Sequence, residues 1–133
     1  MLNKIELPTS QSTQFISITD RIRGLLSSSG ITNGICYIFV PHTTAAVTIN
    51  ENADPDVVSD IDRFLTLNID SQCDYRHIEG NSPAHIKASL LGSTATVIIE
   101  NGQLLLGTWQ GIYFCEFDGP RKRSFFVKFI PSA

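Results

Sequence analysis

All three histidines of the chain lie in two short polar segments, at residues 41–44 and 75–85. Imidazole is a common zinc ligand, and three imidazoles with an open fourth position form a catalytic zinc site. The spacing alone does not require such a site. His42 and His77 are 35 residues apart, His77 and His85 are eight apart, and no HxxxH or HExxH pattern occurs. The alternative is that each histidine is a partly buried, hydrogen-bonded residue.

A run of acidic residues follows the first polar segment and could gather a divalent cation. These acids all precede the first basic residue of their region, Arg63: Glu51, Asp54, Asp56, Asp60 and Asp62. Acids in the first turn of a helix are stabilised by the helix dipole, which accounts for Asp54 and Asp56 without a function. Glu51 stands instead at the end of a predicted strand, where its side chain can point into a cleft.

Three further positions suit a phosphorylated ligand or an aromatic contact. Ser82 and Pro83 open a predicted helix, whose free N–H groups either bind an anion or are simply capped. Arg121 can hold a phosphate with its forked guanidinium, or it can belong to a basic strand edge. Trp109 can be an aromatic platform for a ligand or an anchor in a subunit interface.

Capping signals predict three helices that help to position these residues. Thr19 or Asp20 caps the first helix, which Gly30 ends. Asp54 caps the second, which Pro55 opens and which runs to about residue 68. The third helix begins at residue 82 and stops at residue 92.

Short apolar and alternating runs predict about eight strands. The continuous apolar run from Ile35 to Val40 indicates a central strand covered on both faces, and Asn101-Gly102 indicates a tight hairpin. Because strands and helices do not alternate strictly, we expect one α+β domain over residues 1–133 with a mostly antiparallel sheet. The expected strands lie at residues 2–7, 13–18, 35–40, 45–50, 97–99, 104–106, 111–117 and 123–130.

Composition excludes several classes of protein. The net charge of 10 − 13 = −3 argues against a general nucleic-acid binder. The longest apolar run is far shorter than the roughly 20 residues of a membrane span, and the N-terminus lacks the apolar segment of a signal peptide. Three cysteines without a CxxC pair are typical of a reduced, cytoplasmic protein, with Cys36 and Cys115 in apolar strands and Cys73 in a loop. The low charged fraction, 17%, favours oligomerisation, because a small domain with few charges leaves apolar surface to cover.

Three long motifs of the chain resemble the YjbQ-like family, whose members are often described as secondary thiamine-phosphate synthases. The first motif is HTTAAVTINENADPDV at residues 42–57, and the second is YRHIEGNSPAHIKASLLG at residues 75–92. The third is GQLLLGTWQGIYFCEFDGPRKR at residues 102–123. With the general pattern between the motifs, the resemblance extends over nearly the whole chain.

The resemblance implies a compact α+β homotrimer with a polar site that contains His42, His77 and His85. It also implies a divalent metal ion, zinc or magnesium, held by these three histidines. Catalytic roles are expected for Glu51, Glu79 and Arg121. Substrate-binding roles are expected for Asn52, Asn81, Ser82, Trp109, Gln110, Glu116 and Asp118.

We therefore expect a cytoplasmic metal-binding enzyme that joins a pyrimidine pyrophosphate to a thiazole phosphate and releases pyrophosphate. Its partners would be phosphorylated small molecules and copies of itself, with no nucleic acid and no membrane. Two alternatives stay open. One is a metal-dependent hydrolase, in which a three-histidine metal activates water and Glu51 is the general base. The other is a binding protein for a metal or a phosphorylated metabolite without catalysis.

Overall fold

A computed structural model describes residues 2–69 and 71–133, and these residues form eight strands and three helices. The α+β class and the mostly antiparallel pairing predicted from the sequence are confirmed. The helices are α1 (Thr19–Ser29), α2 (Pro55–Asn68) and α3 (Ser82–Leu91). The strands are β1 (Leu2–Pro8), β2 (Gln14–Ser17), β3 (Gly34–Phe39), β4 (Ala45–Glu51), β5 (Thr94–Glu100), β6 (Gln103–Leu104), β7 (Gln110–Glu116) and β8 (Lys122–Pro131).

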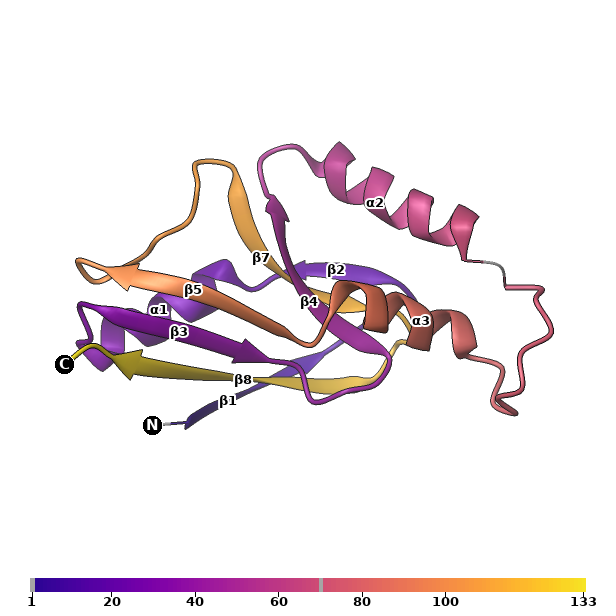
Figure 1. The fold of residues 1–133 in the computed structure, drawn as a ribbon, viewed down its shortest axis with the longest axis horizontal. Coiled ribbons are helices and arrows are strands. Elements are labelled where there is room, and N and C mark those ends of the chain that lie inside the picture. The colour runs from indigo at the N-terminus through magenta and orange to yellow at the C-terminus, as the bar shows by residue number, and fades with distance from the viewer. Residues whose placement is uncertain (1, 70) are drawn as a thin grey trace.

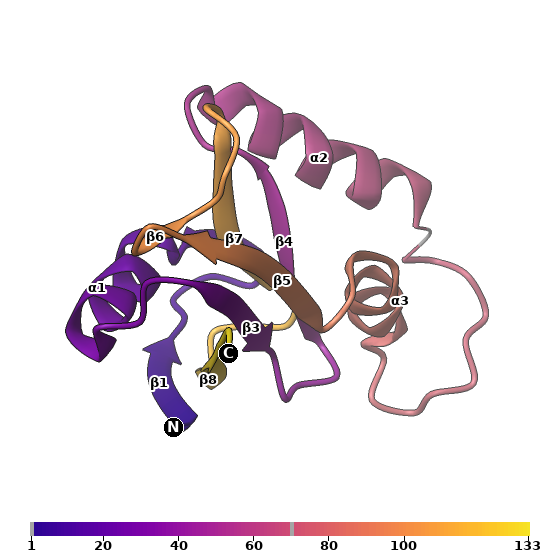
Figure 2. The ribbon, with the colours of Figure 1, turned by 60° about the vertical axis from the view of Figure 1, so that its left-hand side comes forward.

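The strands form two sheets that enclose the main core. The larger sheet has the order β1-β8-β3-β5-β6, and the smaller has the order β2-β7-β4 (Figure 1). Phe114 of β7 and Phe125 of β8 pack between the sheets, with Ile22 of α1 closing one side. A second apolar cluster lies on the other face of the small sheet, where Cys115 meets Leu65 of α2 and residues of α3. The small sheet is therefore covered on both faces, whereas the large sheet is covered on one (Figure 2).

The expectation that the run from Ile35 to Val40 is covered on both faces is wrong. In β3 the burial alternates, so that Cys36 and Ile38 are buried while Tyr37 and Phe39 are exposed. The reason is that nothing in the described chain packs on the outer face of the large sheet. Continuous apolar strands usually mark a doubly covered sheet, and here the second cover is missing within one chain.

The cap predicted for α1 is also wrong, and Thr19 has another role. No side chain caps α1, and the Thr19 hydroxyl accepts a hydrogen bond from the Ile112 amide of β7 at 2.8 Å. Other local signals are confirmed. Gly30 ends α1 with a φ of 72°, and Asn101 and Gly102 turn the β5–β6 hairpin with φ values of 52° and 74°.

Helix α2 begins as predicted but packs sparsely. The Asp54 carboxylate accepts a hydrogen bond from the Asp56 amide at 2.9 Å, and Pro55 opens the helix. Leu65 is its one buried residue, while Phe64 and Leu67 are exposed. The helix runs outward from the tip of β4 (Figure 1). Within the described chain, no helix is long and apolar enough to cross a membrane.

The cysteines lie where the sequence predicts. Cys36 and Cys115 are buried and Cys73 is exposed. Burial raises the pKa of Cys36 to about 12 and that of Cys115 still higher. Because the thiolate is the reactive form, neither buried cysteine is suited to be a nucleophile.

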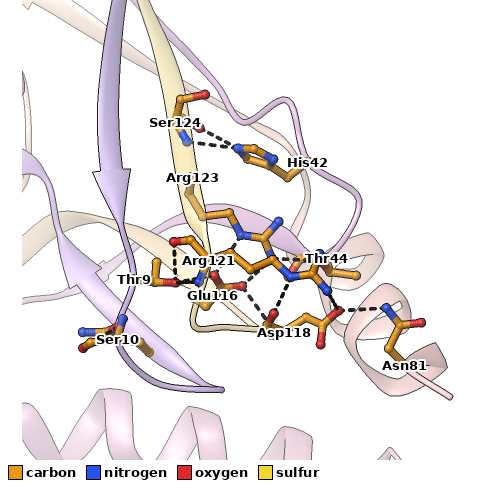
Figure 3. Close-up of polar contacts among 11 residues, drawn as sticks. Thr9, Ser10, His42, Thr44, Asn81, Glu116, Asp118, Arg121, Arg123 and Ser124 are labelled. Carbon is orange, nitrogen blue, oxygen red and sulfur yellow. Dashed lines mark hydrogen bonds and ion pairs between the residues drawn. The ribbon is translucent and has the colours of Figure 1, made fainter. Parts of the chain in front are cut away.

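A buried ion pair joins β7, β8 and the turn between them. The Arg123 side chain is 5% exposed and donates two hydrogen bonds to Glu116, whose side chain is fully buried (Figure 3). The Thr9 hydroxyl, just after β1, donates to the same carboxylate at 2.7 Å, and the Asp118 amide donates at 3.0 Å. Arg123 also donates to the Thr44 hydroxyl at 2.8 Å, so that it reaches the segment before β4.

These contacts determine the charge state of Glu116. Burial alone would raise its pKa, but the hydrogen bonds from Arg123, Thr9 and the Asp118 amide outweigh burial and hold the pKa below its usual range. Ionised Glu116 therefore stabilises the folded state at neutral pH. That stabilisation is lost as the pH falls through the lowered, folded-state pKa.

We predict that Arg123→Met lowers the free energy of unfolding at pH 7 by about 3–5 kcal/mol, because it leaves a buried carboxylate without its cation. Urea titration at matched protein concentration measures the loss. The double variant Glu116→Gln with Arg123→Met serves as the control. It should be less destabilised because no buried charge is left without a partner, and the amide oxygen can keep one of the two hydrogen bonds that Thr9 and the Asp118 amide donate to separate carboxylate oxygens. Equal losses in the two variants would contradict the ion-pair assignment.

Candidate functional site

A polar pocket of about 340 Å³ opens where the β3–β4 connection, the start of α3 and the β7–β8 turn meet. We call it the histidine pocket, because all three histidines line it. The pocket gathers seven of the predicted site residues, namely His42, His77, Glu79, Asn81, His85, Asp118 and Arg121. Pro41, Thr43, Thr44 and Arg123 complete the lining. The two polar segments of the sequence therefore do converge in space, although 35 residues separate them.

His42 is held against the backbone of β8. Its Nε2 lies 3.0 Å from the Ser124 amide nitrogen, which donates to it when the proton is on Nδ1. The same Nε2 lies 3.1 Å from the Ser124 carbonyl oxygen, which accepts when the proton is on Nε2. Burial and the nearby Arg123 charge lower the pKa of His42, so it is neutral at pH 7. Only Nδ1 is left free to meet a ligand.

His77 and His85 form a pair on the opposite wall. Their ring centroids are 5.2 Å apart and the ring planes are almost perpendicular, at 88°. His85 lies in the first turn of α3, and His77 belongs to the irregular segment that leads into the helix. The ring of His42 is instead fixed by Ser124, so it is not part of this pair.

The three histidines do not make a metal site within one chain. Among residues 2–69 and 71–133, no three His, Cys, Asp or Glu side chains are grouped so that they could hold a metal ion. The hydrogen bond of His42 Nε2 to β8 leaves Nδ1 free, which is the usual arrangement of a histidine that binds a metal through its other nitrogen. A metal ion held by His42, His77 and His85 stays a prediction.

Asp118, Asn81 and Arg121 form a hydrogen-bonded group at the floor of the pocket. Asn81 donates its amide N–H to Asp118 Oδ2 at 2.8 Å, and Arg121 Nη2 donates to the same oxygen at 2.8 Å (Figure 3). Arg121 also donates through Nε to the Asp118 carbonyl oxygen at 2.7 Å. Its side chain is half exposed, so the remaining guanidinium N–H groups are available to a ligand.

Asn81 has one unused hydrogen-bonding atom. Its Oδ1 is buried and accepts no hydrogen bond from any described residue. The side chain does not cap α3 either, although Asn81 is the residue before the helix. A buried acceptor without a donor is costly, and this oxygen is closed to solvent although the residue lines the pocket. Ser82 opens α3 one residue later and is not part of the lining.

The pocket carries slightly more negative than positive charge. Its lining holds the guanidinium groups of Arg121 and Arg123 and the carboxylates of Glu79 and Asp118. The carboxylate of Glu116, buried behind Arg123, adds a third negative charge. With neutral imidazoles the sum is 2 − 3 = −1. A polyanion therefore needs additional positive charge to bind here.

Four predicted site residues lie elsewhere, at the far ends of β4 and β7. We call them the tip cluster: Glu51, Asn52, Trp109 and Gln110. Glu51 is seven residues along the chain from Thr44 of the pocket, and at about 3.4 Å per strand residue the two lie about 24 Å apart. Within one chain, the tip cluster and the histidine pocket are therefore separate.

The tip cluster is rigidly built. The Tyr113 hydroxyl lies 3.0 Å from both the Glu51 carbonyl oxygen and Asn52 Oδ1. The Asn52 amide donates to the Trp109 carbonyl oxygen at 2.8 Å, and Gln110 Oε1 accepts from the Gly107 amide at 2.8 Å. The Asn52 side chain also lies over Gly111, where an added Cβ would come within 2.6 Å of it.

Sequence reasoning placed Glu116 among the substrate-binding residues, but its carboxylate lies beneath the lining and holds Arg123. The sequence did not predict that Thr44 holds Arg123, that Ser124 holds His42 or that Tyr113 holds the end of β4. The available signal was an acid and a base, Glu116 and Arg123, on consecutive apolar strands, since a charge in such a strand needs a partner.

Comparison with known proteins gives one consistent result. The family model described as "UPF0047 protein YjbQ-like" matches residues 3–132. A UPF0047 protein of Methanocaldococcus jannaschii is 52% identical over 98% of this chain and 94% of its own length. The UPF0047 protein YugU of Bacillus subtilis is 48% identical over 98% of this chain and 99% of its own.

Solved structures share the fold as well as the sequence. An uncharacterised YjbQ/UPF0047 protein of Clostridium acetobutylicum has a TM-score of 0.94 at 56% identity, over 96% of this chain and 99% of that one. A protein of unknown function from Sulfolobus solfataricus has a TM-score of 0.94 at 33% identity, over 99% and 97%. With its motifs, its fold and its full-length relatives in agreement, the chain belongs to the YjbQ-like UPF0047 family.

Proposed function

We propose that the histidine pocket binds a small molecule that carries a pyrophosphate. The organic group of this molecule is transferred to a second phosphorylated reactant, and the pyrophosphate leaves. The observation that supports this most directly is the group at the pocket floor. Arg121 offers free N–H donors to phosphate oxygens, and Asp118, which Asn81 also contacts, holds its guanidinium in place. His77 and His85 line the opposite wall, where imidazole N–H groups can contact the same oxygens.

The specific reaction that we propose follows from the family resemblance. The thiazole nitrogen of a thiazole phosphate donates its electron pair to a carbon of a pyrimidine pyrophosphate. The bond between that carbon and the pyrophosphate oxygen breaks, and its electron pair leaves with the pyrophosphate. No proton is transferred, so the site has to hold two phosphorylated reactants and stabilise negative charge on the leaving group.

The charge of the pocket gives a divalent cation a place in this reaction. The fixed charge of −1 repels free pyrophosphate, so we propose that the pyrophosphate enters as its magnesium complex. Magnesium is commonly held by substrate phosphates with only one or two protein carboxylates, and Glu79 and Asp118 are available for that contact. Such a cation is part of the substrate, and it does not require three histidine ligands.

We also propose that the protein is a homotrimer. The outer face of the large sheet exposes a row of large apolar side chains that no described residue covers. A contiguous patch of this kind is typical of an interaction surface. Its members are Leu2 on β1, Ile35, Tyr37 and Phe39 on β3, Ile98 on β5 and Ile130 on β8. The unpaired cysteines accord with the cytoplasmic location that we expect for such a metabolic enzyme.

We predict that the purified protein forms thiamine phosphate from both precursors in the presence of magnesium. Arg121→Ala should weaken pyrophosphate binding about 10- to 100-fold, because it removes a charge-assisted contact of about 1.5–3 kcal/mol. Isothermal titration calorimetry measures the binding. Arg23→Ala, at an exposed ion pair on α1, is the matched control and should change neither binding nor product.

The same assay separates the alternatives. Consumption of a single precursor would indicate hydrolysis, and binding without turnover would indicate a binding protein. If neither precursor binds to the assembled protein, the proposed function is wrong.

We predict that pyrophosphate binds at least about tenfold more tightly with magnesium than with EDTA, because the cation offsets the negative charge of the pocket. The variant Glu79→Gln with Asp118→Asn should reduce this difference, because it removes two carboxylates that both repel the anion and contact the cation. Calorimetry with and without magnesium measures both effects. Equal affinities in magnesium and EDTA would contradict the cation proposal.

We predict a mass near 3 × 14.7 = 44 kDa by sedimentation equilibrium at micromolar concentration. Tyr37→Lys should shift the protein toward monomer, because it places a charge at the centre of the apolar outer face. Ser27→Lys on the exposed side of α1 adds the same charge elsewhere and should leave the mass unchanged. A monomeric wild-type protein would exclude the trimer.

A further inference from the structure

A second cavity adjoins the histidine pocket and has no part in the proposed function. It has a volume of about 480 Å³ and lies between α3 and the start of β4. We call it the side compartment. His42, Thr43 and His85 line both cavities, so the two imidazoles stand at the boundary between them. The rest of the side compartment is lined by small residues: Ala45, Ala88, Ser89, Gly92 and Ser93.

One face of α3 forms a rigid wall of the side compartment. His85, Ala88 and Ser89 share this face, because residues three and four apart in a helix are neighbours on its surface. Ala88 is buried in the apolar cluster that joins α3 to the small sheet, so the helix is held beside β4 (Figure 1). At the end of the helix, the Gly92 carbonyl oxygen accepts a hydrogen bond from the Val47 amide of β4 at 3.1 Å. The shape of this wall therefore does not depend on a bound ligand.

Gly92 also shows that the side compartment has free space beside the backbone. A Cβ added at this position would have no atom within 4 Å, and the φ of 94° is one that side chains rarely allow. Small-molecule sites usually have volumes of about 300–1,000 Å³, and the side compartment falls in this range. It therefore has room for a group of the size of an aromatic ring.

The two cavities differ in the charge of their walls. The histidine pocket is lined by two guanidinium groups and two carboxylates, whereas the described lining of the side compartment holds no Asp, Glu, Lys or Arg. Its polar groups are hydroxyls and the two imidazoles. The Ser89 hydroxyl donates to the His85 carbonyl oxygen at 2.9 Å, which leaves its own oxygen to accept from a ligand. Thr43 and Ser93 are exposed, so their hydroxyls can donate or accept.

This wall determines the chemical class of the group that it suits. An ionised phosphate would find no cationic partner in the side compartment, and burying a charge without a partner is costly. An uncharged ring with hydrogen-bonding atoms at its edge would instead meet hydroxyl groups, and its faces would lie against the small side chains of Ala45 and Ala88.

We propose that the side compartment binds the uncharged ring of the ligand whose pyrophosphate lies in the histidine pocket, so that one ligand spans both cavities. The bond that breaks then lies at the boundary, beside His42 and His85. A ligand with both parts binds more tightly than pyrophosphate alone, because the second part meets its site without a second association step. The proposal rests on the proposed function for the pyrophosphate, whereas the ring site can also be tested with a ligand that lacks it.

Calorimetry in magnesium tests whether the ring adds affinity. We expect wild-type protein to bind pyrimidine pyrophosphate at least about tenfold more tightly than inorganic pyrophosphate, because the ring makes additional contacts. Ser89→Phe places a large side chain in the side compartment from an exposed position of α3. It should abolish the difference between the two ligands and leave the affinity for inorganic pyrophosphate unchanged.

Leu90→Phe is the matched control, because it adds a ring to the next residue of α3, which is exposed and outside the lining. This variant should keep the full difference between the two ligands. Equal affinities for the two ligands in wild-type protein would overturn the proposal. A difference that survives in Ser89→Phe would also overturn it.

Protection from labelling tests the ring site without pyrophosphate. In a Cys73→Ser background, where the remaining cysteines are buried, Ser89→Cys is labelled with N-ethylmaleimide. The pyrimidine alcohol, which is the same ring without pyrophosphate, should slow labelling at least about fivefold at saturation, because a bound ring keeps the reagent from the thiolate. Inorganic pyrophosphate should not slow it, and Leu90→Cys should be labelled at one rate with or without either ligand.

The two experiments separate the ring site from the proposed function. If pyrophosphate does not bind but the pyrimidine alcohol protects residue 89, the proposed function fails and the ring site stands. If pyrophosphate binds but no pyrimidine ligand protects residue 89, the ring site is overturned and the pyrophosphate site stands. Equal protection of residues 89 and 90 would also overturn the ring site, because the effect would not be specific to the side compartment.

Discussion

The buried carboxylate of Glu116 is the constraint on which the histidine pocket depends. It receives hydrogen bonds from Arg123, from Thr9 after β1 and from the backbone of the β7–β8 turn, so it joins parts of the chain that come from both sheets. Arg123 also donates a hydrogen bond to Thr44, which fixes the segment before β4. Ser124, the next residue along β8, fixes the ring of His42. One charge that cannot be exposed or neutralised cheaply therefore sets the position of side chains on three sides of the pocket.

The same charge shapes the chemistry of the pocket. The guanidinium of Arg123 is committed to Glu116, and its field helps to keep His42 neutral. Arg121 is only partly committed, since Asp118 uses two of its N–H groups and leaves the others free. The pocket thus has one cation with free donors, a neutral imidazole and two carboxylates in its lining. This combination suits a ligand that brings phosphate and a metal ion together better than it suits a bare anion.

Local signals were enough to predict most elements, because their causes lie within a few residues. Asp54 and Pro55 begin α2, and Asn101 with Gly102 turns the β5–β6 hairpin, as the sequence indicated. Predictions that depended on distant partners were less accurate. The hydroxyl of Thr19 bonds to β7 instead of capping α1, and the outer face of β3 has no cover within the chain. The prediction that the three histidines share one site came from the family resemblance, because their spacing alone does not show which loops meet.

Strand β4 explains why the remaining motif residues are not in the pocket. It begins beside Thr44 at the pocket and ends at Glu51 in the tip cluster, and β7 pairs along its whole length. A paired strand does not shorten, so no loop movement within one chain brings its two ends together. The sequence keeps chemistry-bearing residues at both ends of this strand, and the rigid hydrogen bonding of Asn52 and Tyr113 preserves their arrangement at the far end. Within a single copy, the paired strand therefore holds the tip cluster and the histidine pocket apart.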